Sequence, residues 1–523
     1  MAQLVRSRAR HGLLAATILA TFTALTACSG GAAPAGDKAG RTLTIAVSAA
    51  PTLDPYKANV DPNNIQTASL GYASLIRLNA DRTYSGDLAE SYGYTDTENK
   101  IFQMRLRPGL KFADGTPLDA AAVVASLQYM LKVSPNAKSW AGTITGITAS
   151  DASTIVVTNK SPNPVMRQLF SQAVLSGSVV SPAGLADQAT LAERTFGAGP
   201  YVLDPAGTVP NDHYTYTINP NYWNKNGQHW QKVVVRVIPD ANATVQAIQA
   251  NQIDYASLNA DAGPAVKAAG LKHVTSSVAM IGMMLADRDG TVAPQLKDVR
   301  VRQALSYAID REAIATALFG EFAKPTSQTA APGFDGYDKA LDARYPHDPE
   351  RAKRLLAEAG YAGGFTLRIA STGAFGIGLV TQAVAAQWKE IGVTVELNTD
   401  AQMAQWQQSV LSRKFPVSGY AFGNLPTYLL SLNFALPVAN PFNPFATQDE
   451  ALTGLLTQAS NEADQAAQAG LYRQANARLT ELAWFAPVVR IEGIAVMGPR
   501  VAGVEQTSDN GLPNVATVRP AAA

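Results

Sequence analysis

The side chains that most often carry catalysis or hold metal ions are scarce in this chain. Its 523 residues include one cysteine and five histidines; the histidines are His11, His213, His229, His273 and His347. No two of them stand at the short spacing that zinc sites use, and there is no second cysteine. A Gly-x-Ser-x-Gly elbow, the signature of many α/β hydrolases, is also absent from the sequence. We therefore predict no protein-built metal site, no cofactor and no enzyme activity.

The glycine-rich segment 371–378, STGAFGIG, precedes a predicted helix and could hold an anion at the helix N-terminus. Its glycines follow the spacing G-x-x-G-x-G, which is neither a dinucleotide fingerprint nor a phosphate-binding loop. A flexible connection between a strand and a helix is the favoured interpretation.

The single cysteine, Cys28, lies just after a short apolar segment near the start of the chain. Three arginines precede residues 13–25, LLAATILATFTAL, which are too few to span a membrane as a permanent helix. A basic start, a short apolar run and small residues before a break are typical of a secretory signal peptide.

The four residues 25–28, Leu-Thr-Ala-Cys, resemble the lipobox of bacterial lipoproteins. In those proteins a diacylglyceryl group is joined to the cysteine thiol and the chain is cut just before it. We predict a lipoprotein signal peptide over 1–27, lipidation of Cys28 and a flexible tether over 28–40. An ordinary secretory signal with an incidental cysteine is the alternative.

The charge balance excludes some classes of partner. The chain has 42 Lys and Arg against 41 Asp and Glu, and these charges are scattered, which argues against nucleic acid as a partner. No segment after the signal reaches 18 consecutive apolar residues, so no later membrane span is expected. The length allows two or three domains.

Strand and helix patterns alternate along the chain. Residues 42–47 alternate as a strand should, and residues 232–240 read as a buried strand because of their β-branched run. Asp119, Asp298 and Asp348 each stand where the N-cap of a helix is expected.

Residues 365–370, 379–392 and 393–397 read as strand, helix and strand, which is a βαβ unit. Such units build parallel or mixed sheets covered by helices. The predicted fold class is therefore α/β, in the mixed α+β sense.

Several segments, in this order, resemble the family 5 solute-binding proteins of ABC importers, the peptide- and nickel-binding group. They extend over nearly all of the chain after the tether: residues 43–55, 88–127, 197–203, 219–223, 298–314, 345–361, 389–397 and 477–494. The strand–turn–helix stretch 101–127 and the helix VRVRQALSYAIDR are the most specific of them.

The resemblance implies a two-lobed periplasmic-binding-protein fold that closes around a ligand by hinge motion and then docks on a membrane permease. It implies a monomer. The chain would cross from lobe I to lobe II near Met280–Ala286 and return near Pro487–Arg490. The expected domains are lobe I over 41–69, 191–282 and 487–523, an inserted subdomain of lobe I over 70–190, and lobe II over 283–486.

In peptide-binding members of this family, an aspartate in a lobe II loop pairs with the α-ammonium group of the peptide. The matching position here holds Asn424, and no Asp or Glu occurs from residue 401 to residue 448. An amide cannot neutralise a buried ammonium. The resemblance with this departure predicts a small organic ligand other than a standard peptide with a free amino terminus; hydrophobic peptides, glycans, metal chelates and aromatic compounds stay open.

The same stretch is rich in aromatic residues. Trp406, Tyr420, Phe422 and Tyr428, together with Asn424, are predicted to contact the ligand through ring stacking and hydrogen bonds. Core packing is the alternative for each ring, and it is favoured for Trp406, which falls in a helical pattern.

Three further ligand contacts are expected from the first strand and from the return crossing. Ala49 and Ala50 follow the first strand and would offer backbone groups. Arg490 would pair with an anionic group of the ligand, and a surface salt bridge is the alternative for this residue.

These observations predict a lipid-anchored receptor on the outer face of the cell membrane, which delivers a small organic solute to the permease of an ABC importer. Two other classes stay open. One is a sensory or chaperone-like receptor of the cell envelope, and the other is a hydrolase on the same scaffold.

Overall fold

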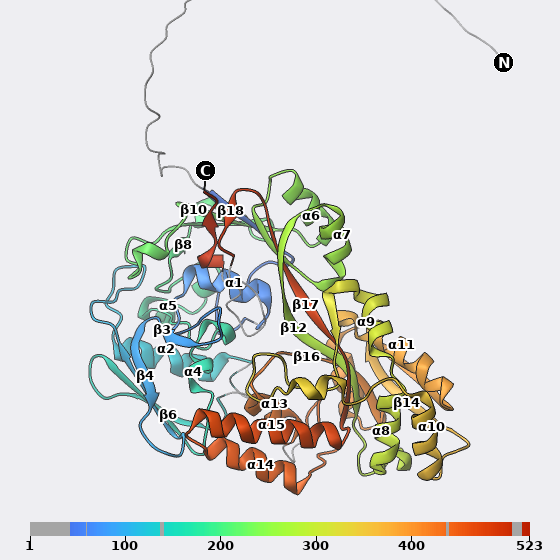
Figure 1. Ribbon diagram of the computed structural model, residues 1–523. Helices are drawn as coiled ribbons and strands as arrows, with labels where there is room; N and C mark the ends of the chain where they lie inside the picture. The colour runs from blue at the N-terminus through green and yellow to red at the C-terminus, as the bar shows by residue number, and fades with distance from the viewer. Residues whose placement is uncertain are drawn as a thin grey trace, which may run out of the picture. The chain divides into compact units, whose positions relative to one another are not determined.

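Two long antiparallel strands run through the centre of the main sheet. The computed structural model describes residues 42–522 except 59, 136, 138–140, 436–438 and 505–514. In it β12 (Lys272–Leu285) pairs with β17 (Phe485–Met497), and the two strands lie side by side in Figure 1. Beyond them β11 continues the sheet from β17 and β16 continues it from β12. The two strands therefore connect two halves of one sheet.

The sheet has the order β15-β14-β16-β12-β17-β11-β1-β10-β9-β8, with β13 paired to β17. On one side β1 is parallel to both β10 and β11, and on the other side β14 is parallel to both β15 and β16. The strands not yet defined are β1 (Thr42–Val47), β8 (Tyr201–Leu203), β9 (His213–Ile218), β10 (Lys232–Val237), β11 (Tyr255–Leu258), β13 (Ala323–Pro325), β14 (Phe365–Thr372), β15 (Val393–Asp400) and β16 (Val417–Gly423).

A separate four-stranded sheet has the order β4-β5-β7-β6. Its strands are antiparallel, and α2 (Ala120–Val133) contributes Val123 and Leu127 to the core beneath it. A short β2–β3 hairpin precedes this sheet, and a β18–β19 pair lies near the end of the chain. The bounds are β2 (Ile76–Leu78), β3 (Tyr84–Gly86), β4 (Ala89–Tyr94), β5 (Ile101–Leu106), β6 (Ile144–Ala149), β7 (Thr154–Asn159), β18 (Val501–Ala502) and β19 (Arg519–Pro520).

The predicted helix caps are confirmed. Asp119 accepts a hydrogen bond from the Ala122 N–H, Asp298 from Arg300 and Asp348 from Arg351, which satisfies backbone donors that the first helical turn leaves free. The remaining helices are α1 (Pro62–Gly71), α4 (Met166–Leu169), α5 (Pro182–Ala186), α6 (Ala241–Gln249), α7 (Gly263–Ala268), α8 (Val299–Tyr307), α9 (Arg311–Phe319), α10 (Pro349–Glu358), α11 (Ile377–Glu390), α12 (Met403–Leu411), α13 (Thr427–Phe434), α14 (Glu450–Asn461) and α15 (Gln465–Glu481).

The predicted βαβ unit is also confirmed. β14 and β15 are parallel from Phe365↔Val393 to Thr372↔Asp400, and α11 connects them. Trp388 on α11 is fully buried and its indole N–H donates to the Leu305 carbonyl at 2.9 Å. The mixed α/β class predicted from the sequence is therefore correct.

The predicted signal peptide, lipidation site and tether lie outside the described residues. Within the part of the chain that the structure describes, no helix combines the length and the apolar character needed to cross a membrane. The predicted boundaries of the two lobes and of the inserted subdomain stay predictions.

Candidate functional site

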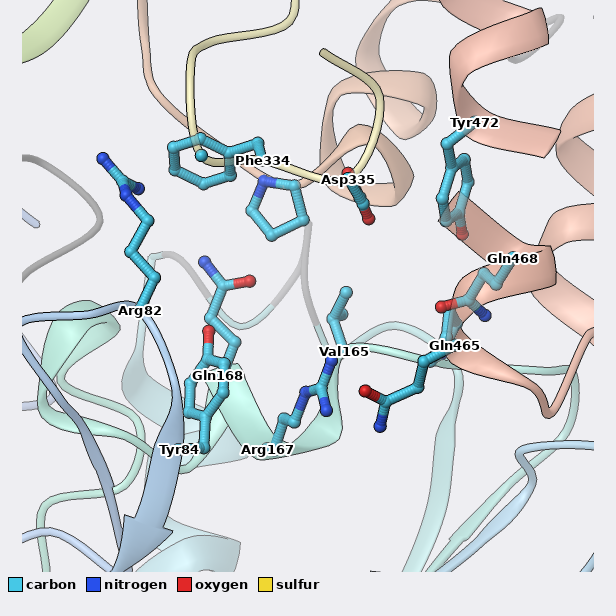
Figure 2. Close-up of a pocket in the computed structure, with 13 residues that line it drawn as sticks. Arg82, Tyr84, Val165, Arg167, Gln168, Phe334, Asp335, Gln465, Gln468 and Tyr472 are labelled. Carbon is cyan, nitrogen blue, oxygen red and sulfur yellow. The ribbon is translucent and has the colours of Figure 1, made fainter. Parts of the chain in front are cut away.

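A cavity of about 330 Å³ lies between residues that are far apart in the sequence. One side is lined by residues of the β2–β3 hairpin, of the segment before α4 and of α4 itself: Arg82, Tyr84, Pro164, Val165, Arg167 and Gln168. The other side is lined by Gly333, Phe334, Asp335, Pro426, Gln465, Gln468 and Tyr472 (Figure 2). This volume is at the lower end of the range of small-molecule sites.

Two arginines stand at the hairpin side of the cavity. Arg82 adopts a left-handed conformation, φ 66°, in the turn between β2 and β3, and its guanidinium lies 4.5 Å from the ring centre of Phe334. Arg167 on α4 lies 5.2 Å from the ring centre of Tyr84. Such cation–π contacts orient the plane of a guanidinium group.

The acid of the cavity is Asp335, on the loop that follows β13. Its Oδ1 accepts hydrogen bonds from the N–H and the hydroxyl of Thr427, at 3.0 and 2.8 Å. Thr427 is the first residue of α13, so this bond fixes the carboxylate to the start of that helix. Within the described residues Asp335 has no ion-pair partner, so its negative charge is not neutralised by the protein there.

Tyr472 on α15 completes this side of the cavity. It is 1% exposed, and its hydroxyl is buried without a hydrogen-bond partner among the described residues. Burial raises the pKa of the Tyr472 phenol far above its usual value, and the Asp335 carboxylate adds to the rise, so the hydroxyl stays protonated. Figure 2 shows this hydroxyl directed toward Gln468 at the edge of the cavity. A buried hydroxyl without a hydrogen-bond partner destabilises the folded state unless a ligand or a water molecule forms a hydrogen bond with it.

A second cavity, of about 520 Å³, lies at the carboxyl ends of the parallel strands β1, β10 and β11. This edge of an open parallel sheet is where ligands bind in many α/β proteins. Ala49 and Ala50 line it, as does Phe375, which is 67% exposed. The lining includes three carboxylates, Asp61, Asp240 and Asp261, and no Lys, Arg or His.

The predicted aromatic residues are packed against one another. Trp406 is 2% exposed and donates from its indole N–H to the Gly419 carbonyl at 3.1 Å. Tyr420 is fully buried against Phe422 and Phe485, and Phe422 contacts Phe442 in a tilted arrangement with ring centres 3.9 Å apart. This arrangement agrees with the alternative that these rings pack in the hydrophobic core. Their contact with a ligand stays a prediction.

Asn424 and Tyr428 make contacts with distant parts of the chain. The Asn424 amide donates to the carbonyl and the hydroxyl of Ser277, at 2.7 and 3.0 Å. The Tyr428 hydroxyl donates to the Pro162 carbonyl at 3.1 Å. A role for either residue in ligand binding stays a prediction.

The alternative proposed for Arg490 is wrong. The residue is 4% exposed, so it forms no surface salt bridge; its Nη2 donates to the carbonyls of Gln328 and Ala330. Its Nε and Nη1 are buried without a hydrogen-bond partner among the described residues. Burial lowers the pKa of the Arg490 guanidinium to about 10, and it remains a cation at neutral pH.

Arg82, Arg167, Asp335 and Tyr472 were not among the site residues predicted from the sequence. Only Asp335 carried a local signal, because it stands between two glycines in the segment Gly333-Phe334-Asp335-Gly336. A charged residue in a glycine-rich loop is a reasonable candidate for binding. Among the residues that the structure describes, no group of three or more metal-ligating side chains is close enough to hold a metal ion.

The fold of this chain has close matches among solved structures. The model resembles HbpA2 from Haemophilus parasuis, with a TM-score of 0.80 and 22% identity over 92% of this chain and 100% of the other. It also resembles NikA from Brucella suis in complex with Fe(III)-EDTA, with a TM-score of 0.78 and 21% identity over 92% and 100% of the two chains. The fold is therefore the two-lobed periplasmic-binding-protein fold.

The family follows from the sequence comparison. The family model described as "Bacterial extracellular solute-binding proteins, family 5 Middle" matches residues 83–435, which is more than half of the chain, and the chain belongs to this family. The glutathione-binding protein GsiB of Escherichia coli K12 is 28% identical over 327 residues, which are 61% of this chain and 62% of that protein. The chain therefore aligns with less than two thirds of this relative.

Proposed function

We propose that this protein is a lipid-anchored receptor on the outer face of the cell membrane. It captures a small organic solute between its two lobes, closes by hinge motion and delivers the solute to the permease of an ABC importer. The observation that carries the proposal is the cavity of Figure 2, because its two walls come from residues 82–168 and 333–472 and present charged and polar groups to one space. Family membership supports the same function.

The proposed division of the chain follows the sequence analysis. Lobe I comprises 41–69, 191–282 and 487–523 with the inserted subdomain 70–190, and lobe II comprises 283–486. Strands β12 and β17 would then act as the two crossings, which agrees with their pairing along nearly their full lengths. The protein would work as a monomer.

The solute is proposed to be other than a standard peptide with a free amino terminus. The loop at Asn424 lacks an acid, and Asn424 is already bonded to Ser277. The relatives' names do not decide the matter, since GsiB is described as glutathione-binding and NikA was solved with Fe(III)-EDTA. Contacts from Ala49, Ala50, Trp406, Tyr420, Phe422, Asn424, Tyr428 and Arg490 remain part of the proposal.

The first test is co-purification of the solute. Residues 30–523 are exposed to an extract of the native host and repurified, and the small molecules released on denaturation are identified by mass spectrometry against a mock purification. We expect one enriched compound that raises the melting temperature and lowers the radius of gyration in solution scattering. Consumption of the compound, with no change in scattering, would favour a hydrolase instead.

The second test concerns the anchor. Two acyl chains hold a protein firmly on a bilayer, whereas one chain binds only marginally. We expect the full-length protein to incorporate labelled fatty acid and to sediment with membranes, and the Cys28→Ser variant to do neither. Equal membrane association of the two proteins would contradict lipidation of Cys28.

A further inference from the structure

We propose that the cavity of Figure 2 binds a small zwitterion, with the cationic group of the ligand against Asp335 and its anionic group against Arg167. The inference rests on the proposed receptor function and adds the chemical class of the solute. It also identifies an acid for the ligand's cation that does not come from the loop at Asn424.

The cationic end is defined by Asp335. Its Oδ1 is held by the N–H and hydroxyl of Thr427, and none of the ion pairs among the described residues includes its carboxylate. A half-buried carboxylate without a protein cation is best completed by an ammonium or guanidinium group, through charge-assisted hydrogen bonds.

Tyr472 supplies the second observation at this end. Its hydroxyl is buried, lines the same cavity and lacks a hydrogen-bond partner within the described residues. The adjacent Gln468 amide uses its N–H₂ group on the carbonyls of Ala459 and Glu462, at 2.9 and 3.0 Å, which leaves its oxygen as an acceptor. The tyrosine oxygen and the amide oxygen can both accept from a ligand N–H group.

The anionic end is defined by Arg167, on the opposite wall. Its guanidinium is oriented over the ring of Tyr84 and is half-buried, and no acid of the described residues forms an ion pair with it. Glu462 lines the adjoining cavity together with Arg167, but its Oε1 accepts from the Asp464 N–H at 2.8 Å. The planar guanidinium is suited to a carboxylate, which it can bind through two parallel hydrogen bonds.

The two charges complement each other across the space but do not pair with each other. In Figure 2 Asp335 and Arg167 come from different elements and face the cavity from opposite sides. Between them Val165, Phe334 and Pro426 provide apolar contact for a short carbon skeleton. A molecule with one cation and one anion would satisfy both walls at once, whereas a neutral or singly charged molecule would leave one charge without a partner.

The experiment uses a panel of zwitterions and their blocked forms. The skeletons are ω-amino acids of graded length. Each is prepared free, N-acetylated, C-amidated and blocked at both ends. Binding to the chain without its signal peptide is measured by calorimetry, together with the shift in melting temperature.

We expect free forms to bind best, and each block to weaken binding about ten- to a hundred-fold, which is the effect of losing one charged hydrogen bond. Asp335→Asn should weaken binding of the free form by the same factor but leave the N-acetylated form unchanged. Arg167→Gln should weaken binding of the free form but leave the C-amidated form unchanged. Asp187→Asn and Arg194→Gln, at exposed positions outside the cavity, are the matched controls. They should leave the affinity for every form of the ligand unchanged.

Three outcomes would overturn the proposal: doubly blocked forms that bind as tightly as free forms, variants that weaken all forms equally, or no binding by any member of the panel. The melting temperature of each variant without ligand shows whether it is folded. A neutral solute recovered by co-purification that still closes the protein would sink this inference and leave the receptor function intact. Absence of any retained solute, with substrate turnover, would sink the receptor function itself.

Discussion

At the scale of single residues, the candidate site presents groups suited to binding. Asp335 and Arg167 carry opposite charges and form no ion pair among the described residues, and the Tyr472 hydroxyl is buried there without a hydrogen-bond partner. Catalysis of acyl transfer would need a nucleophile within hydrogen-bond reach of a base. The lining of this cavity includes no Ser, Thr, Cys or His.

Replacement of Tyr472 by Phe separates the stability of the fold from ligand binding. The free energy of unfolding should stay the same or rise by up to about 1 kcal/mol, because the buried hydroxyl has no partner to lose. Affinity for the solute recovered by co-purification should fall about ten-fold, since the ligand loses one hydrogen bond. Urea unfolding and calorimetry measure the two quantities. A loss of stability with unchanged affinity would show that the hydroxyl serves the fold instead.

At the scale of elements, the carboxylate of Asp449 both caps α14 and connects this helix to α15. Asp449 caps α14 by accepting from the Leu452 N–H at 2.8 Å, and it forms an ion pair with Arg478 of α15 at 2.8 Å. Hydrogen bonds from Arg478 lower the pKa of the Asp449 carboxyl below its usual value. The pair therefore fixes the helix that carries Tyr472 to its neighbour.

Asp449→Ala should lower the free energy of unfolding at pH 7 by about 1–2 kcal/mol, through loss of the cap and of a partly exposed ion pair. Because the folded-state pKa is lowered, this contribution is complete above the unfolded value of about 4 and is lost as pH falls through the lower folded-state pKa. The difference in the free energy of unfolding between Asp449→Ala and the wild type, measured by urea unfolding, should therefore shrink toward pH 3.

Asp464→Ala is the matched control for this prediction. Asp464 caps α15 by accepting from the Ala467 N–H at 2.8 Å, and it forms no ion pair among the described residues. The change in the free energy of unfolding caused by Asp464→Ala therefore measures the contribution of a helix cap alone. If the loss of stability caused by Asp449→Ala grew as the pH fell, the stabilising role given to the Asp449 carboxylate would be wrong.

A second prediction at this scale concerns the contact between β16 and α11. A Cβ atom at Gly419 would stand 2.3 Å from Thr381 Oγ1 and 2.9 Å from Ile377 Cγ2. Gly419→Ala should therefore lower the free energy of unfolding by about 1–3 kcal/mol through overpacking. Gly454→Ala, on α14 with no atom within 4 Å of the new Cβ, should raise it by up to about 1 kcal/mol. Equal effects of the two changes in urea unfolding would be inconsistent with this packing.

At the scale of the whole molecule, a few contacts join the four-stranded sheet to α14. Asn99 precedes β5, and its amide donates to the carbonyls of Ser460 and Glu462 at the end of α14, at 3.2 and 3.1 Å. In the proposed domain scheme this contact joins the inserted subdomain to lobe II. It would then help to hold the two lobes closed around the solute.

Asn99→Gly tests this contact without straining the backbone, because Asn99 has φ 55° and glycine adopts that conformation freely. Under the proposed hinge closure, loss of these two hydrogen bonds between the inserted subdomain and lobe II should weaken solute affinity about ten-fold and reduce compaction in solution scattering. Asn251→Gly, at an exposed residue with φ 57°, is the control and should bind normally. Identical behaviour of the two variants would remove Asn99 from the closing contact.

Local features of the fold were readable from the sequence because they depend on neighbouring residues. The caps at Asp119, Asp298 and Asp348 and the strand–helix–strand unit from 365 to 397 are examples. Burial was less predictable, since it depends on what covers each face. The buried strand predicted over 232–240 ends at Val237, and Val233 and Val235 are fully buried while Lys232 is exposed, because β10 has one well-covered face.

The sequence by itself determined the class of fold, the family and the absence of an acid from 401 to 448, which are properties of order and composition. Only the tertiary structure decided that Asp335 meets Thr427, Tyr472 and the wall with Arg167. It also decided that Arg490 is buried. The physical reason is that a binding cavity is built from side chains of distant segments, and their proximity depends on how the two halves of the chain pack around β12 and β17.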